Sequence, residues 1–365
     1  RRGVISRGFL MTMGLFYASA SYIHDPDNTI TPLTDYTRMS LSFLLAPQLL
    51  GDPVGSLPLA KQRGAGAAVI ALPASADNAA GQYTPFMGHP GSSYDVPTLF
   101  VDRDTGAMLK ARIANGAQAR LRLVVDEHKG ESTDDIIATL PGMSDEVVVI
   151  NTHSDGPSAS EENGGIALMA LAQYFSALPK SCRQRTLVFV MTPGHFHGGI
   201  GGDTDRFLDH HPEIVARAVA SLTPEHLGQM EWLDDAQGFH ASGMVEPSIF
   251  FGSNAPAVQA LLVNAVRAED LRRTMVARPI AGAIYFGVGS PMNSAGIPNG
   301  GYITGPHSML SWADNQHLDK TDAQRMAAEV RTFARIVTAF DGASKDLLCL
   351  GMTPSGSHTS ACFGG

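Results

Sequence analysis

The chain has 365 residues, 44% of them hydrophobic and 17% charged, so a disordered chain is excluded, and at about 150 residues per domain two domains are expected. Asp and Glu number 35 against 26 Lys and Arg, a formal net charge of −9 that argues against a general nucleic-acid binder and against docking on anionic membranes. No stretch reaches about 18 uninterrupted apolar residues, so no membrane span is expected.

The first third of the chain alternates short apolar runs with turns. The expected elements are strands at residues 64–72, 97–101 and 119–125 and a helix over residues 104–113. Asp104 and Thr105 are the expected N-cap of that helix. These elements predict a small α/β domain over residues 1–128, in which the pattern of about the first 60 residues is the least clear.

The rest of the chain alternates strands and helices more regularly. The expected strands cover residues 135–140, 146–151 and 186–191, and the expected helices cover residues 164–178, 203–208, 213–218, 257–268 and 322–340. This order predicts an α/β fold with a doubly wound, mainly parallel sheet and helices on both faces. The domain is expected to cover residues 129–345, with a loop-rich tail over residues 346–365. Its functional side chains should gather at the carboxyl ends of the strands.

Three cysteines cannot all pair with one another. Cys349 and Cys362 are close in sequence and can form a local bridge, which leaves Cys182 free. Three reduced thiols are an equally open alternative. A bridge favours a secreted or periplasmic location, although no signal segment is visible in the sequence.

Four segments with acidic or histidine side chains follow predicted strands or begin a helix. They are residues 151–155 (NTHSD), 160–165 (SEENGG), 193–199 (PGHFHGG) and 223–228 (TPEHLG). In the first segment, His153 precedes Asp155 by two positions, a spacing that suits a metal ligand held by a neighbouring carboxylate. Each segment alone is a weak signal, because acidic pairs also complement helix dipoles and loop histidines are usually solvated. Together they are expected to meet at one edge of the sheet.

In this order, the segments resemble the co-catalytic zinc aminopeptidases of peptidase family twenty-eight, a group that includes glutaminyl cyclases and glutamate-carboxypeptidase-like proteins. The resemblance covers about residues 133–342. Upstream, the stretches GAGAAVIALP and VPTLFVDRDTGAML resemble the protease-associated domain that is often joined to that catalytic domain. The resemblance implies an aminopeptidase-like fold and a hydrolase that acts on an amide or peptide-like bond.

When the family's site residues are compared with this sequence one by one, the resemblance implies that the ligands of one zinc ion are retained. His153 takes the place of a histidine ligand, and Asp155 takes the place of the aspartate that orients it. Glu161 stands where the family has an aspartate that bridges two zinc ions, and Glu225 stands where it has a later aspartate ligand. The resemblance therefore implies a metal site of His153, Glu161 and Glu225.

The ligands unique to the second zinc ion are lost. Phe196 replaces a zinc-binding glutamate, and Trp312 falls at the place of the second-ion histidine, with His307 and His317 close to it in sequence. Phe and Trp have no lone pair for coordination. One divalent ion, most suitably zinc, is therefore the expected cofactor. His197 is a further candidate ligand if its side chain turns inward.

The position of the general base is altered as well. The family has a glutamate there, whereas this chain has His195. Imidazole exchanges a proton near neutral pH, so His195 is the expected acid/base, with Asp155 and Glu162 as the other catalytic candidates. The preferred function is a divergent single-metal hydrolase with a peptide or small-molecule substrate. Glu231, Asp234 and Asp235 are expected to be solvated or to select a cationic group of that substrate.

Two other functions remain open. One is a non-catalytic protein that binds a peptide or small molecule on a peptidase scaffold, with Phe196 and Trp312 filling the space of the metal. The other is a metal-free lyase or isomerase in which His195 moves a proton.

Overall fold

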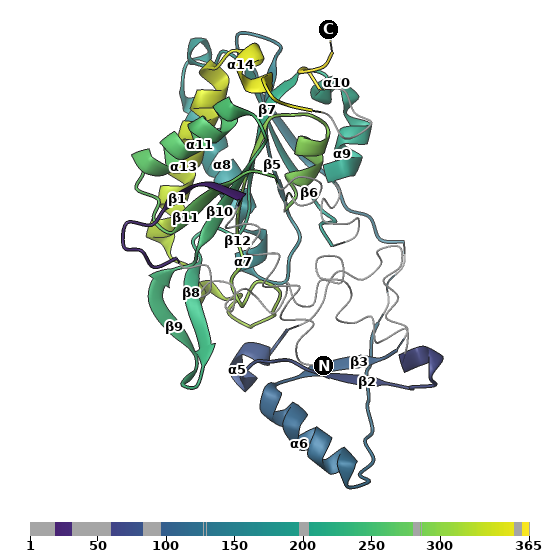
Figure 1. The fold of residues 1–365 in the computed structure, drawn as a ribbon. Coiled ribbons are helices and arrows are strands. Elements are labelled where there is room, and N and C mark those ends of the chain that lie inside the picture. The colour runs from purple at the N-terminus through teal and green to yellow at the C-terminus, as the bar shows by residue number, and fades with distance from the viewer. Residues whose placement is uncertain are drawn as a thin grey trace.

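The computed structural model describes residues 19–30, 60–82, 96–126, 128, 130–196, 204–279, 285, 287–353 and 360–364. Among these residues, a large sheet lies between two groups of helices, and a smaller α/β unit lies beyond one end of its strands (Figure 1). No helix in these ranges combines the length and the apolar content needed to cross a membrane.

The large sheet has eight strands. In spatial order they are β1 (Ala20–His24), β11 (Thr274–Ala277), β10 (Ser248–Gly252), β12 (Asn299–Thr304), β7 (Ala218–Pro224), β5 (Val147–His153), β6 (Thr186–Thr192) and β4 (Ile136–Leu140). The four central strands from β12 to β6 are parallel, as are β10 and β11. The remaining pairs are antiparallel. The expected mainly parallel sheet is confirmed.

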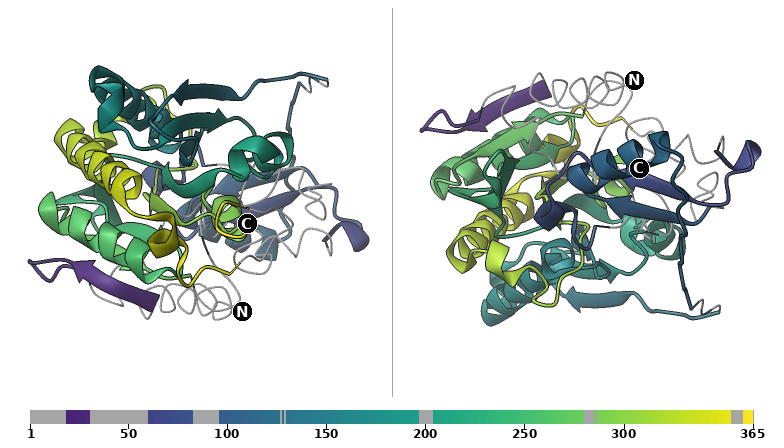
Figure 2. Two further views of the ribbon diagram at one scale, coloured as in Figure 1. Left: turned by 90° about the horizontal axis from the view of Figure 1, so that it is seen from above. Right: turned by 90° about the horizontal axis from the view of Figure 1, so that it is seen from below.

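Helices cover both faces of this sheet, as Figure 2 shows from above and below. One group consists of α8 (Gly164–Ala177), α11 (Pro256–Ala268) and α13 (Ala323–Gly342), and the other of α9 (Thr204–His210), α10 (Pro212–Val215) and α12 (Ser290–Ser294). Successive residues of a strand point to opposite faces. Val148 and Ile150 of β5 accordingly pack with the first group, whereas Val147 and Val149 pack with the second.

The small unit contains a parallel pair of strands, β2 and β3. Its elements are β2 (Ala68–Ala71), α5 (Ala76–Ala79), β3 (Thr98–Val101) and α6 (Arg103–Ala114). The N-cap of α6 is Asp102, not Asp104 or Thr105, because the Asp102 carboxylate accepts hydrogen bonds from both of their backbone amides at 2.9 Å.

The prediction of a strand at residues 119–125 is wrong, because these residues do not form a strand in the structure. Leu123, Val124 and Val125 are 49%, 73% and 70% exposed, so their side chains are not buried as those of a strand in a sheet would be. The N-terminal end also departs from the expected domain 1–128, because β1 pairs with the edge strand β11 of the large sheet. The boundary near residue 128 stays a prediction.

The remaining elements are short helices and one β-hairpin, which belong to neither of the two helix groups. They are α7 (Ala159–Glu162), η1 (Lys180–Cys182), the hairpin of β8 (Met230–Asp235) and β9 (Gly238–Val245), η2 (Leu318–Lys320) and α14 (Lys345–Cys349). The hairpin extends toward the small unit (Figure 1). The tail that was expected to be loop-rich thus contains the end of α14.

Asp234 on this hairpin joins the hairpin to the small unit. One of its carboxylate oxygens accepts hydrogen bonds from the Ser75 amide (2.8 Å) and the Asn78 side chain (3.0 Å), and Arg103 lies 3.4 Å from the other oxygen. Asp234 is therefore not solvated as expected. The same correction applies to Glu231, which is buried against Arg273 at 3.0 Å.

Replacing Asp234 by alanine is expected to lower the free energy of unfolding by about 2 kcal/mol, because two hydrogen bonds to a charged group are lost. Burial raises the pKa of Asp234, but the hydrogen bonds from Asn78 and Ser75 outweigh it and hold the pKa below its ordinary value. The stabilisation is therefore complete above about pH 4 and is lost as the pH falls through the lowered pKa. Urea titration at pH 7 and pH 3 measures this difference, with the exposed Asp145→Ala variant as control; equal losses in the two variants would contradict it.

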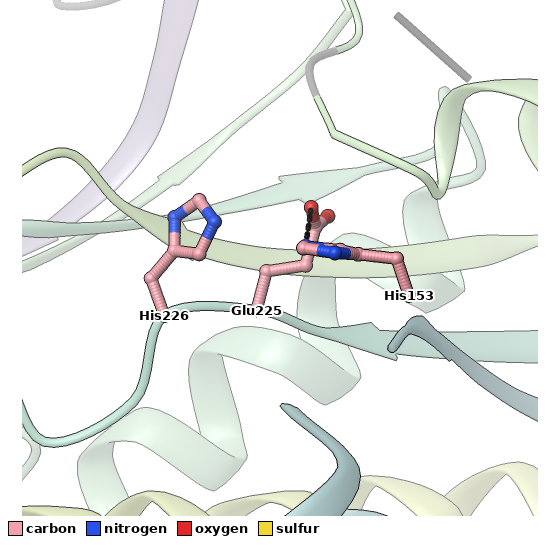
Figure 3. A group of neighbouring side chains, drawn as sticks. All are labelled: His153, Glu225 and His226. Carbon is pink, nitrogen blue, oxygen red and sulfur yellow. Dashed lines mark ion pairs between the residues drawn. The ribbon is translucent and has the colours of Figure 1, made fainter. Parts of the chain in front are cut away.

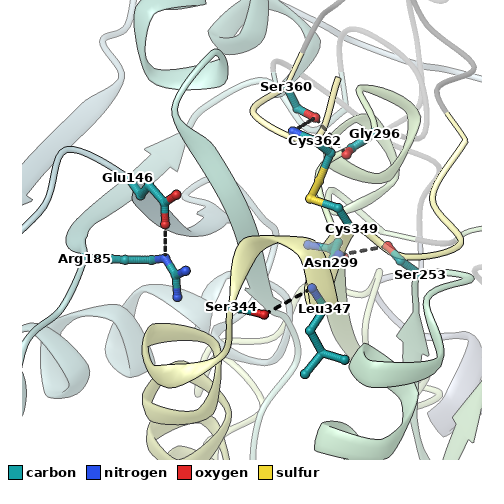
Figure 4. The surroundings of a disulfide bond; sticks show 10 residues. All are labelled: Glu146, Arg185, Ser253, Gly296, Asn299, Ser344, Leu347, Cys349, Ser360 and Cys362. Carbon is teal, nitrogen blue, oxygen red and sulfur yellow. Dashed lines mark hydrogen bonds and ion pairs between the residues drawn. A yellow bond between two sulfur atoms is a disulfide. The ribbon is translucent and has the colours of Figure 1, made fainter. Parts of the chain in front are cut away.

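A disulfide closes the C-terminal end of the chain (Figure 4). It joins Cys349 in α14 to Cys362, and Cys182 is a free, exposed thiol. Next to the bridge, the Ser360 hydroxyl donates to the carbonyl of Gly296 (2.8 Å), which precedes β12. The bridged alternative from the sequence is therefore the one present in the structure.

Replacing both Cys349 and Cys362 by serine is expected to cost about 3 kcal/mol of unfolding free energy, since the bridge closes a loop of 13 residues that otherwise has more freedom in the unfolded chain. Chemical denaturation of the double variant against Cys182→Ser measures the loss. A double variant as stable as Cys182→Ser would show that the bridge does not constrain the unfolded chain.

Candidate metal and catalytic site

The four segments singled out in the sequence meet at the carboxyl ends of the central parallel strands. His153 is the last residue of β5, and Glu161 lies on α7, the short helix that follows. His195 follows β6 by three residues, and Glu225 comes directly after β7. Because these three strands are parallel, their ends lie at one edge of the sheet. The predicted convergence is confirmed, whereas the role of each residue stays a prediction.

His153 is 1% exposed and has a fixed orientation. Its Nδ1 donates to the backbone carbonyl of Asp155 at 2.8 Å, so Nε2 carries the lone pair. The Asp155 carboxylate is 3.7 Å from the same Nδ1, and it accepts a hydrogen bond from the His195 amide at 3.2 Å. Asp155 therefore orients His153 mainly through its carbonyl, and its carboxylate positions the loop that carries His195.

The charges around His153 favour a cation. Burial alone lowers the pKa of His153. Its hydrogen bond with Asp155 and its attraction to the carboxylates of Glu161 and Glu225 act in the opposite direction, outweigh burial and raise the pKa to about 9. Burial raises the pKa of Glu225. When no other cation is bound, a second proton on His153 is thus expected to offset the negative charge of these carboxylates.

Glu225 is 1% exposed, and the backbone around it is shaped to its carboxylate. The Val288 amide donates to Oε1 at 3.0 Å, and Oε2 lies 3.7 Å from His153 Nε2. Gly287 adopts a φ of 80°, and a Cβ at this position would collide with the Glu225 carboxylate. A glycine at 287 is therefore required both by the backbone conformation and by this contact.

His226 is a site residue that the sequence analysis did not single out as a ligand. It is 1% exposed, its Nδ1 donates to the Thr304 carbonyl at 2.8 Å, and its Nε2 lies 3.1 Å from Glu161 Oε2. Figure 3 shows it beside Glu225 and His153. The only signal was its place in the segment 223–228, next to a predicted ligand.

Two overlapping groups of side chains can hold a metal ion. The ligand atoms of His153, Glu225 and His226 all lie within 4.8 Å of one another, and so do those of His153, Glu161 and His195. His153 belongs to both groups. The rings of His153 and His195 are stacked, with centroids 4.3 Å apart.

The nitrogen and oxygen atoms of these side chains that point into the cluster face one another, at 3.1 Å between His226 Nε2 and Glu161 Oε2 and 3.7 Å between His153 Nε2 and Glu225 Oε2. His153 Nε2, both oxygens of Glu161, Glu225 Oε2 and His226 Nε2 are buried and have no hydrogen-bond partner. Buried polar atoms are normally paired, so a set of lone-pair atoms that converge without partners fits a bound cation. Imidazole nitrogen and carboxylate oxygen are ligands that suit zinc.

Other predicted residues lie outside this cluster. Trp312 is 57% exposed, and its amide donates to the Gly81 carbonyl, so it does not fill the metal space as one alternative required. Its loop runs outward to contact the small unit. Phe196 does lie beside the cluster, with its ring 4.8 Å from that of His195. Glu162 is exposed, and its carboxylate is in neither group of candidate ligands.

Neither histidine near Trp312 joins the candidate ligand groups found among the described residues. His317 Nε2 lies 2.8 Å from the Ser311 hydroxyl, and His307 Nδ1 lies 3.4 Å from the Asn78 side chain. Both therefore have local structural contacts in the loop after β12. His197, the other candidate, lies outside the residues that the structure describes.

No protein-family model matches the sequence, and no curated protein matches it. Among solved structures, the chain is similar to the peptidase M28 precursor from Shewanella amazonensis SB2B, with a TM-score of 0.55 over 80% of this chain and 63% of that chain, at 17% sequence identity. The chain has the fold of a peptidase M28 protein.

Two further solved structures cover a similar share of the chain. The aminopeptidase from Aneurinibacillus sp. strain AM-1 is 16% identical over 78% of this chain and 64% of that one, with a TM-score of 0.46. BSAP, a zinc aminopeptidase from Bacillus subtilis, is 13% identical over 79% and 68%, with a TM-score of 0.49. The chain spans less than two thirds of the Shewanella and Aneurinibacillus proteins. The peptidase M28 fold agrees with the predicted fold class, whereas the likeness of the small unit to a protease-associated domain stays a prediction.

Proposed function

We propose that this chain is a hydrolase that uses one divalent metal ion, zinc by its ligands, to cleave an amide or peptide-like bond. The observation that carries the proposal is the buried cluster of lone-pair atoms without partners at the carboxyl ends of β5 and β7. The peptidase M28 fold supports the reaction class. The substrate is a peptide or a small molecule with such a bond.

His153 and Glu225 would hold the ion, with Glu161 as the third ligand that the sequence predicts. All three side chains are 1% exposed, so the ion would be largely shielded from solvent by the protein. When bound, a divalent ion supplies a Lewis acid that polarises the scissile carbonyl. Because burial has already removed water from the carboxylates, the attraction between them and a cation is strong.

His195 would move the protons of the reaction. Water adds to the carbonyl carbon and gives up a proton, the bond from carbon to nitrogen breaks, and the leaving nitrogen takes a proton. An imidazole can accept the first proton and return it to the nitrogen. His195 is 7% exposed, at the border of the buried cluster, and Asp155 holds its backbone amide. Glu162, exposed at the same edge, is proposed to contact the substrate.

A chelator experiment tests this function. The protein is assayed with aminoacyl p-nitroanilides, dipeptides and an ester series, before and after removal of metal with EDTA. Hydrolysis that EDTA abolishes and one equivalent of zinc restores is the expected result. Turnover that survives metal removal would instead support a metal-free reaction of His195. A protein that binds a peptide, does not hydrolyse it and takes up no zinc would support the alternative of a non-catalytic binding protein.

A further inference from the structure

The two candidate ligand groups compete for one atom. Both include His153 Nε2, which has a single lone pair because Nδ1 donates to the Asp155 carbonyl. The further ligands of a single ion at this atom then come from Glu225, His226, Glu161 and His195. The choice rests on which side chains are already oriented for binding.

Each member of the first group is oriented by a backbone group. The Asp155 carbonyl fixes His153, the Val288 amide fixes Glu225, and the Thr304 carbonyl fixes His226. In each case one polar atom is held by the backbone, and the remaining atom is buried without a hydrogen-bond partner. Metal-binding histidines typically donate their other ring nitrogen in this way, which fixes the tautomer and the ring orientation.

The backbone of His226 supports the same reading. Its φ is 55°, in the left-handed region that costs energy for a residue with a Cβ. This conformation turns His226 to the same edge as its neighbour Glu225, whereas two successive strand residues would point to opposite faces. Strained residues of this kind persist where the surrounding structure holds them, often at functional sites.

Glu161 is placed differently. Neither of its carboxylate oxygens has a hydrogen bond that fixes it, although the side chain is 1% exposed. Its two oxygens instead face two histidines, Oε2 at 3.1 Å from His226 Nε2 and Oε1 at 3.7 Å from His195 Nε2. Glu161 therefore lies beside the proposed ligands without a backbone contact that orients its carboxylate for a metal ion.

We propose that His226 is a metal ligand and that the ion is held by His153, Glu225 and His226, with Glu161 and His195 beside it and not coordinated to it. This inference rests on the proposed function and changes its ligand set. Two histidines and one glutamate form a ligand set that catalytic zinc sites use, and it leaves one coordination position open. In this ligand set His226 takes the place that the sequence analysis gave to Glu161.

Zinc binding to variants of the intact protein tests the inference. The variants are His226→Asn, which tolerates the left-handed backbone, Glu161→Gln, and the half-exposed His211→Asn as control. Zinc affinity is measured by competition with a chromophoric chelator on metal-stripped protein. His226→Asn is expected to weaken binding by more than the roughly 100-fold that loss of an outer hydrogen bond causes. Glu161→Gln and the control are expected to retain one equivalent within about tenfold of the wild-type affinity.

A second readout does not depend on affinity. The visible absorption of bound Co²⁺ reports its ligands, and it is expected to change in His226→Asn and to remain in Glu161→Gln. Thermal unfolding of the metal-stripped variants checks their folding, and His226→Gly replaces the asparagine variant if that one does not fold. Loss of the ion in Glu161→Gln with retention in His226→Asn would overturn the inference and leave the proposed function intact. No zinc in the wild-type protein would overturn both.

Discussion

Replacing His153 by alanine is expected to abolish both metal binding and hydrolysis. His153 is common to both candidate ligand groups found among the described residues, so an ion held by either group would lose a ligand. A metal ion supplies several kcal/mol of transition-state stabilisation, so its loss should lower kcat/KM by at least about 1000-fold. Elemental analysis and kinetics on the same preparation measure the two losses together.

The control for this variant is His211→Ala, which removes a half-exposed histidine from the N-terminus of α10. It should retain both the ion and the activity. A His153→Ala protein that folds and still contains a full equivalent of zinc would place the metal elsewhere in the chain. Folding is checked by thermal unfolding, since the cavity left by a buried imidazole also costs stability.

Replacing His195 by glutamine is expected to separate chemistry from metal binding. General acid–base catalysis by one side chain typically contributes about 100- to 10,000-fold, so kcat should fall by an amount in that range. The ion should remain bound, because His195 is proposed to act beside it and not to hold it. Glutamine retains a hydrogen-bonding side chain of similar length but has no group that exchanges a proton near neutral pH.

Two results of the His195→Gln experiment would contradict this assignment. Loss of the metal would show that His195 is a ligand, as the group with His153 and Glu161 allows. An unchanged kcat with the metal in place would show that a group other than His195 transfers the proton. The metal content therefore has to be measured in the same sample as the rate.

Much of the fold follows from the sequence because its strongest signals are local. The apolar runs at residues 146–151 and 186–191 are long enough to form strands buried on both faces, and they became β5 and β6. Residues 119–125 show the limit of this reasoning. Alternation of polar and apolar residues predicts a strand only where a second strand is available to pair with it, and pairing depends on the tertiary structure.

The site was predictable at the level of segments but not of every side chain. His153, Glu161, His195 and Glu225 converge because each follows a parallel strand or its connecting helix. His226 was not predicted as a ligand because its side chain reaches the site through a positive φ, which nothing in the sequence indicates for a residue with a Cβ. Trp312 was assigned from the resemblance, by alignment on residues 318–320, and its loop after β12 has no periodicity that would have shown the side chain to be exposed.

Asp234 illustrates a third kind of failure. An acidic residue on a hairpin is usually solvated, and only the arrangement of the small unit brings Ser75 and Asn78 to its carboxylate. Contacts of this kind depend on how two parts of the chain pack. They are therefore set by the tertiary structure and are not visible as a local pattern in the sequence.

The most direct test of the account is the metal content of the wild-type protein purified without chelator. Elemental analysis is predicted to find about one equivalent of zinc or a similar divalent ion per chain, bound at the cluster of His153, Glu225 and His226. A protein that contains no metal, and takes up none after incubation with excess zinc, would contradict the central claim.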